Sequence, residues 1–158
     1  MIKEKQIDIV IVNWNSGKFL SKCVTSVIDN DNALINKIII VDNASSDKSA
    51  DFLEDINFKK IKYIRLKFNE GFAKGCNIGA ASSKSKYILF LNPDAQIKRG
   101  SLELTYSFME KDTSRDIGIC GVRLQNDLNF DYSCSRFPSI KNLFFEVIGI
   151  NKLFPKHG

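Results

Sequence analysis

The sequence has few of the residues that build metal clusters, disulfide frameworks or membrane spans. Its four cysteines are far apart with no CxxC pair, and His157 is the single histidine. This spacing excludes a recognisable zinc-ligand cluster. No apolar run approaches the roughly 18 residues that a membrane span requires, and the short apolar stretch near the N-terminus lacks a signal-peptide cleavage site. We therefore expect a cytoplasmic protein with reduced thiols.

Long runs of one charge are also absent. The 158 residues include 23 Lys and Arg and 18 Asp and Glu, which gives a net charge of +5. This charge favours anionic ligands only in a general way. The short cluster of Lys59, Lys60 and Lys62 is more typical of a solvated surface than of a nucleic-acid footprint, so we expect no nucleic-acid partner. The length suits one domain, residues 1–158, with a core that needs no disulfides.

Strand-like and helix-like segments alternate along the first two thirds of the chain. Apolar runs rich in β-branched residues predict buried strands at residues 7–12, 37–41, 62–66 and 87–91. Helical spacing of apolar residues predicts helices at residues 18–30, 49–56 and 73–82, the second capped by Ser46 or Asp47. This order predicts an α/β sandwich with a mainly parallel sheet.

The pattern is looser after the fourth predicted strand. We expect a helix near residues 102–110, a strand at 117–124 and an amphipathic segment around 143–150. No internal repeat or linker stands out in this part of the sequence.

Polar residues follow each of the four predicted strands. Ligands of open α/β sheets bind at the carboxyl ends of the strands, so these residues are expected to form one site.

Two familiar phosphate-binding loops are excluded by their spacing. The sequence does not contain a P-loop, because Val12 and Phe19 stand where a glycine and a Ser or Thr are required. Gly71, Gly75 and Gly79 are spaced by four residues and not as GxGxxG. For Gly75 and Gly79 we expect close packing of a helix on the sheet.

Several motifs occur in a characteristic order over most of the chain: VIVNWN (10–15), IIIVDNASSD (38–47), NEGFAKGCNIGA (69–80), YILFLNPDA (87–95) and RFPS (136–139). Together they resemble the sequential motifs of inverting family 2 glycosyltransferases, most closely the rhamnosyltransferase-like branch. The resemblance implies the GT-A fold, a UDP- or dTDP-linked sugar donor, and a saccharide or lipid-linked acceptor in bacterial surface polysaccharide assembly. A lipid-linked acceptor would also allow peripheral contact with the inner face of the membrane. The oligomeric state is not predicted.

The resemblance also implies nucleotide-binding residues. Asp42 would contact the base, although an Asx turn with Asn43 explains the same residue. Trp14, next to a nucleotide contact expected near Val12, could stack on a base or fill the core. Further residues expected to flank the nucleotide are Asn69, Gly71 and Asn77, the last of which could equally be an exposed helix residue.

Asn92, Pro93 and Asp94 occupy the place of the family's DxD metal motif, with Asn92 in place of the first aspartate. Mg²⁺ or Mn²⁺ would then be held mainly by Asp94 and the donor phosphates, with Asn92 beside the nucleotide. A plain turn after a strand explains the same three residues without a metal.

No catalytic base can be assigned. The family supplies this carboxylate in a segment after the RFPS region, and the given sequence ends at Gly158. We therefore expect a donor-binding domain that continues past this point. The alternative is a truncated, non-catalytic domain that binds a nucleotide sugar without turnover.

Overall fold

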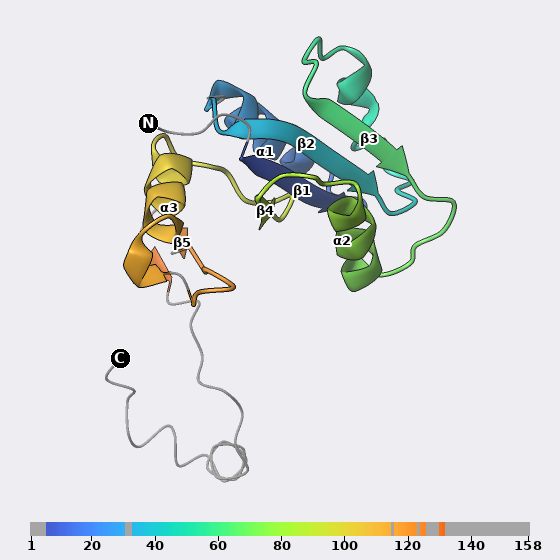
Figure 1. The fold of residues 1–158 in the computed structure, drawn as a ribbon. Helices are drawn as coiled ribbons and strands as arrows, with labels where there is room; N and C mark the ends of the chain where they lie inside the picture. The colour runs from blue at the N-terminus through green and yellow to red at the C-terminus, as the bar shows by residue number, and fades with distance from the viewer. Residues whose placement is uncertain (1–5, 31–32, 115, 123, 126–129, 132–158) are drawn as a thin grey trace, which may run out of the picture. The chain divides into compact units, whose positions relative to one another are not determined.

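The computed structural model describes residues 6–30, 33–114, 116–122, 124–125 and 130–131. The chain divides into two units, Met1–Gly118 and Ile119–Gly158, which are described separately. The first unit carries the four-stranded sheet and its helices (Figure 1).

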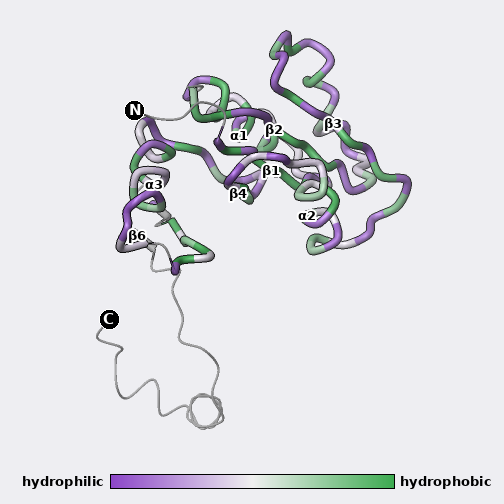
Figure 2. The backbone as a smooth tube through the Cα atoms, in the orientation of Figure 1, coloured by the Kyte–Doolittle hydropathy of each residue, from purple (hydrophilic) through white to green (hydrophobic). Residues whose placement is uncertain are grey.

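The sheet of the first unit is entirely parallel, in the order β3-β2-β1-β4. Its strands are β1 (Ile7–Asn13), β2 (Ile35–Asp42), β3 (Ile61–Arg65) and β4 (Tyr87–Phe90). All seven residues of β1 are buried, as expected of a central strand that is covered on both faces. Among the described residues, long hydrophobic stretches lie in this sheet (Figure 2). The four predicted strands are confirmed.

Helices cover both faces of the sheet. The helix α1 (Lys18–Asp29) packs Leu20, Cys23 and Val24 against the core that includes Ile9 and Ile40. The helix α2 (Phe72–Ala81) lies on the other face, and α3 (Ser101–Met109) packs on the same core as α1 (Figure 1). The predicted fold class, an α/β sandwich with a mainly parallel sheet, is therefore confirmed.

Two glycines bring α2 close to β1. A Cβ atom added at Gly75 would lie 2.8 Å from Val12 Cγ1, and one added at Gly79 would come still closer to Val10. Side chains at these positions would push the helix off the sheet. The predicted packing role of Gly75 and Gly79 is confirmed.

The helix predicted at residues 49–56 is wrong. This segment contains only a single 3₁₀ turn, η1 (Asp51–Glu54), whose N-cap residue, Ala50, makes no side-chain cap. Asp47 instead binds the backbone N–H groups of Gly17 and Ser49, so it ties two loops together and caps no α-helix. The apolar residues of the segment still pack against the core, because side-chain burial does not require a regular helix.

The strand predicted at residues 117–124 is also wrong for residues 117–122. Residues 116–122 pair with no strand, and Ile119 is 92% exposed. Gly118 and Gly121 weaken the strand tendency of this run. A two-residue strand, β5 (Leu124–Gln125), pairs with β6 (Phe130–Asp131) in the second unit.

The remaining part of the first unit follows the sequence pattern. The helix predicted near residues 102–110 corresponds to α3, and a short 3₁₀ turn, η2 (Asp112–Ser114), follows it. The amphipathic segment predicted around residues 143–150 and the RFPS motif lie outside the described residues. Among the helices that are described, none is long and apolar enough to cross a bilayer.

Candidate functional site

Three polar residues form a row across the carboxyl end of the sheet. Asn13, Asp42 and Arg65 are the last residues of β1, β2 and β3. Asn13 is the register partner of Asp42, and Asp42 is the register partner of Arg65. The strand order therefore places side by side three residues that are far apart in the sequence, at the edge where ligands of parallel sheets bind.

Asn13 is buried at the β1 end of this row. Its Nδ2 lies 2.8 Å from Asp42 Oδ1, 2.8 Å from Ser49 Oγ and 3.0 Å from Ser45 Oγ. Its Oδ1 accepts a hydrogen bond from the Ser16 hydroxyl. A buried side-chain amide whose N–H₂ group and oxygen both have hydrogen-bond partners holds those partners in position. Asn13 thus links the end of β1 to the loop that follows β2.

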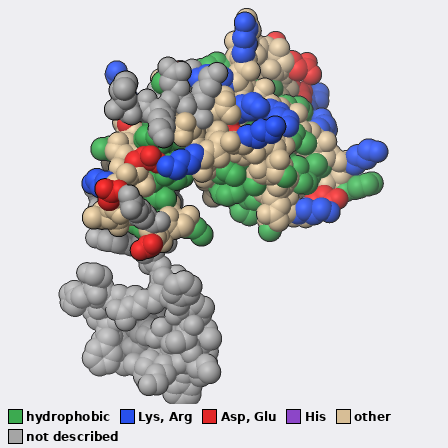
Figure 3. Space-filling model, in the orientation of Figure 1, with side chains coloured by type: hydrophobic (Ala, Val, Ile, Leu, Met, Phe, Trp, Pro, Cys, Tyr) green, Lys and Arg blue, Asp and Glu red, His purple; other side chains and the backbone are tan. Residues whose placement is uncertain are grey.

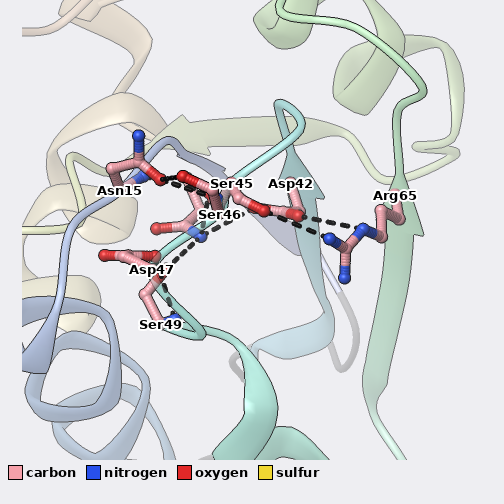
Figure 4. A network of polar contacts seen from close by, with 8 residues as sticks. Asn15, Asp42, Ser45, Ser46, Asp47, Ser49 and Arg65 are labelled. Carbon is pink, nitrogen blue, oxygen red and sulfur yellow. Dashed lines mark hydrogen bonds and ion pairs between the residues drawn. The ribbon is translucent and has the colours of Figure 1, made fainter.

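The loops after β1 and β2 are tied together by further hydrogen bonds (Figure 4). Asn15 Oδ1 accepts from the Ser46 N–H at 2.8 Å, and Asp47 Oδ2 accepts from the Gly17 N–H at 2.7 Å. Desolvation raises the pKa of Asp47, but hydrogen bonds from the Ser49 hydroxyl and amide and the Gly17 amide together outweigh it and lower this pKa. Asp47 is therefore held as a carboxylate that joins the two loops.

Uncommon backbone conformations gather in the same loops. Asn15, Ala44 and Lys48 are the described non-glycine residues with positive φ, at 49°, 61° and 60°. Such conformations cost free energy and persist only where surrounding contacts enforce them. Their clustering beside Asn13 and Asp42 supports a functional role for this edge of the sheet.

The two carboxylate oxygens of Asp42 have different surroundings. The residue is 1% exposed, and its Oδ1 accepts the hydrogen bond from Asn13. Its buried Oδ2 accepts no hydrogen bond from any described residue and has Arg65 Nε at 3.7 Å. Burial, followed by the negative charge of Asp42 and a side-chain interaction with it, raises the pKa of Tyr63 against the lowering effect of Arg65, so the Tyr63 hydroxyl also lies near this carboxylate. Asp42 thus keeps one oxygen available for a hydrogen-bond donor.

Arg65 forms an ion pair with this oxygen. Its side chain is 61% exposed, and its Nη2 donates to the Ser45 carbonyl at 3.1 Å (Figure 4). With Ala44, Leu66 and Lys67 it borders an open hollow of about 500 Å³. A hollow of this size falls within the range of small-molecule sites.

The motif at residues 69–80 contributes a second group of polar contacts at the carboxyl end of the sheet. Asn69 Oδ1 accepts from Asn43 Nδ2 at 2.8 Å and from the Gly71 N–H at 2.9 Å, and Asn43 Oδ1 accepts from the Glu70 N–H. Gly71 has φ of 83°, a conformation that suits glycine. Asn69 therefore positions the loop before α2, while Asn77 is exposed on that helix.

The two predicted residues at the end of β1 are placed differently. Val12 is buried, and its side chain packs against Gly75, so only its backbone faces the carboxyl edge. Trp14 is 57% exposed. Of the two alternatives for Trp14, filling the core is excluded and stacking on a ligand remains a prediction.

Asn92 and Asp94 lie in an exposed turn after β4. Cys23 Sγ on α1 lies 3.5 Å from the Asn92 carbonyl, and Ser26 accepts a hydrogen bond from the Ile97 N–H, so α1 holds this segment. Burial and then the charge of Asp94 raise the pKa of Cys23 to about 12. The described part of the chain has no group of three His, Cys, Asp or Glu side chains that could hold a metal by itself.

Several residues of this site are not predicted from the sequence. Asp47 is expected there only as a helix cap, and no role is predicted for Asn13, Ser45, Ser49 or Arg65. The sequence feature that could have identified Arg65 is its position near the end of a predicted strand, residues 62–66. Lysine and arginine side chains lie at several separate places on the face shown in Figure 3, so charge alone does not mark this arginine.

Comparisons with known proteins agree with this geometry. GlyG of Streptococcus pneumoniae is 28% identical over 134 residues, which cover 83% of this chain and 42% of GlyG. TarP of Staphylococcus aureus, a poly(ribitol-phosphate) β-N-acetylglucosaminyltransferase, is 25% identical over 165 aligned residues, covering 96% of this chain and 49% of TarP. The chain thus spans less than half the length of these curated relatives.

Among solved structures, S. aureus TarS (residues 1–349) in complex with UDP-GlcNAc matches with a TM-score of 0.60 and 21% identity, over 66% of this chain and 31% of that structure. This likeness supports the GT-A fold. The family model described as glycosyl transferase family 2 matches residues 8–157. The match covers the sheet, the row at its carboxyl end and all eight predicted site residues, and the chain therefore belongs to glycosyl transferase family 2.

Proposed function

We propose that this chain carries the donor-binding part of an enzyme that transfers a sugar from a nucleoside diphosphate to a saccharide or lipid-linked acceptor. The observation that carries the proposal is Asp42, a buried carboxylate at the carboxyl end of a parallel sheet, with one oxygen fixed by Asn13 and the other paired with Arg65 but accepting no hydrogen bond. A buried acceptor without a partner is costly unless a ligand supplies the donor. A base or ribose supplies such a donor.

The comparisons support the donor class. TarS, which shares the fold, has been crystallised with UDP and with UDP-GlcNAc. We propose a UDP- or dTDP-linked sugar for this chain, with Trp14, Asn77 and Asn92 close to the nucleotide and the loop held by Asn69 and Gly71 beside it. The rhamnosyltransferase-like motifs favour rhamnose as the sugar. The name of TarP specifies poly(ribitol-phosphate) as its acceptor, which supports a polymeric acceptor for this chain.

We also propose a divalent metal, Mg²⁺ or Mn²⁺, at Asp94. Family 2 enzymes of the GT-A fold commonly use such an ion, and the exposed carboxylate of Asp94 is a suitable oxygen ligand. With a single carboxylate, the donor phosphates would have to provide further ligands. A bound ion of this kind neutralises the diphosphate that leaves with the nucleotide.

Thermal unfolding with added nucleotide tests this function. At about 100 times its Kd, UDP or dTDP should stabilise the chain by about 2.7 kcal/mol. Asp42→Ala should remove most of this stabilisation, and Lys62→Gln, on the exposed part of β3, should keep it. The absence of any shift with millimolar pyrimidine diphosphates would contradict the proposed function.

A further inference from the structure

The position of Arg65 gives this site a second group that can bind a base. Its guanidinium carries five N–H donors, of which Nη2 donates to the Ser45 carbonyl. The Nε···Oδ2 distance to Asp42 is 3.7 Å, too long for a hydrogen bond. Moving the guanidinium aside therefore costs the ion pair with Asp42 and the hydrogen bond to the Ser45 carbonyl, but breaks no hydrogen bond to Asp42.

A ligand that binds Asp42 Oδ2 would meet this guanidinium, because Arg65 Nε lies 3.7 Å from that oxygen. Oδ2 is buried, whereas the side chain of Arg65 is mostly exposed beside the open hollow. An exposed arginine can rotate into the hollow at little cost in packing. The ligand then meets an acceptor, Oδ2, next to a cationic donor, Arg65.

Uracil and thymine present the complementary pair. Ring position 3 is an N–H donor, and both neighbouring ring carbons carry carbonyl oxygens that accept hydrogen bonds. In cytosine the unprotonated nitrogen at position 3 is an acceptor, which would face a carboxylate oxygen. Asn13 fixes the orientation of Asp42 through Oδ1, so the same oxygen, Oδ2, is always the one presented.

We propose that Arg65 is a base-reading residue that determines specificity: with Asp42 Oδ2 receiving the N3–H of uracil or thymine, the Arg65 guanidinium donates to the adjacent carbonyl. This proposal rests on the proposed function, since it assumes that the site takes a nucleotide. It assigns Arg65 to the base and not to the phosphates, although its positive charge would suit either.

NMR titrations with uridine, UMP and UDP separate these roles, because uridine has no phosphate. Arg65→Gln should weaken all three ligands by a similar factor of about ten, the value for one lost charge-assisted hydrogen bond. Arg65→Lys keeps the charge but loses the planar fork, so it should restore little of the uridine affinity. Lys62→Gln, which removes an exposed cation from the same strand, should change none of the three. In the wild type, 3-methyluridine and cytidine should bind more weakly than uridine.

Three results would overturn the assignment. Loss of UDP affinity with unchanged uridine affinity would place Arg65 on the phosphates. A gain in affinity for all three ligands would show that Arg65 only blocks access to Asp42 and does not bind the base. Equal binding of cytidine and uridine would exclude the proposed reading of position 3. Failure of the wild type to bind UDP at all would overturn the proposed function as well, and this outcome is distinct from the other three.

Discussion

Asp8 lies at the opposite end of β1 from the candidate site and is fully buried. Burial raises its pKa, but hydrogen bonds from Ser83, Asn36 and the Lys84 amide outweigh burial, so the pKa lies below its ordinary value. A carboxyl group with a lowered folded-state pKa stabilises the fold above its unfolded-state pKa, and this stabilisation is lost as the pH falls through the folded-state value. Asp8 therefore anchors the amino end of the sheet at neutral pH.

Asp8→Asn should lower the free energy of unfolding at pH 7 by about 2 kcal/mol, because an amide N–H₂ would face groups that donate hydrogen bonds. The difference from the wild type should shrink as the pH falls below about 4, where the carboxyl group of the unfolded chain becomes protonated. Urea unfolding at a series of pH values measures both effects. Asp29→Asn, an exposed control, should change the stability by no more than about 0.5 kcal/mol. A pH-independent difference for Asp8→Asn would contradict this role.

Asp94 is the residue on which the proposed metal depends. Calorimetric titration of UDP should give a higher affinity with Mn²⁺ than with EDTA, because the ion reduces the repulsion between Asp94 and the diphosphate. In Asp94→Asn the two affinities should become similar, with unchanged thermal unfolding because the side chain is exposed. Equal affinities with Mn²⁺ and EDTA in the wild type would exclude the metal.

The contact between α2 and β1 depends on glycines, so it is a property of two whole elements. Gly79→Ala should lower the free energy of unfolding by about 1–3 kcal/mol, since the new Cβ overlaps Val10 and the helix must shift. Gly118→Ala is the matched control, because nothing lies within 4 Å of a Cβ there. Urea unfolding measures the free energy of unfolding of both variants and of the wild type. Equal stability of the two variants would mean that α2 tolerates displacement from the sheet.

Elements whose side chains alone determine their structure were predictable from the sequence. The continuous apolar runs of β1 and β2 and the stripe of α1 fall in this group. The segment at residues 49–56 was not predictable, because Asp47 bonds to Gly17 in a distant loop instead of capping a helix. The run at residues 117–122 has apolar residues but no partner strand among the described residues.

The candidate site was predictable only in part for the same reason. Motif order located Asp42, Asn69 and Asp94, since each follows a strand. The row of Asn13, Asp42 and Arg65 depends on the strand order β3-β2-β1 and on the register, and neither can be read from spacing along the chain. Non-local pairing therefore determines the details of the site.

The molecule as a whole carries a net charge of +5, which should add a long-range attraction for anionic donors. Raising the ionic strength from about 0.05 M to about 0.5 M at fixed Mg²⁺ should weaken UDP binding severalfold, because salt screens this attraction. Uridine, which is neutral, is the matched control and should keep its affinity. NMR titration of both ligands measures the effect. Equal salt dependence for UDP and uridine would show that charge does not contribute.

Hydrogen exchange with and without UDP tests the position of the donor site most directly. Bound nucleotide should slow exchange at backbone amides of the carboxyl edge, in residues 13–17, 42–49 and 69–71, because binding stabilises the loops that Asn13, Asp42 and Asn69 hold. Amides at the opposite edge, in residues 34–36 and 84–86, should change much less. Protection confined to that opposite edge, or no protection under saturating UDP, would contradict a donor site at the carboxyl ends of the strands.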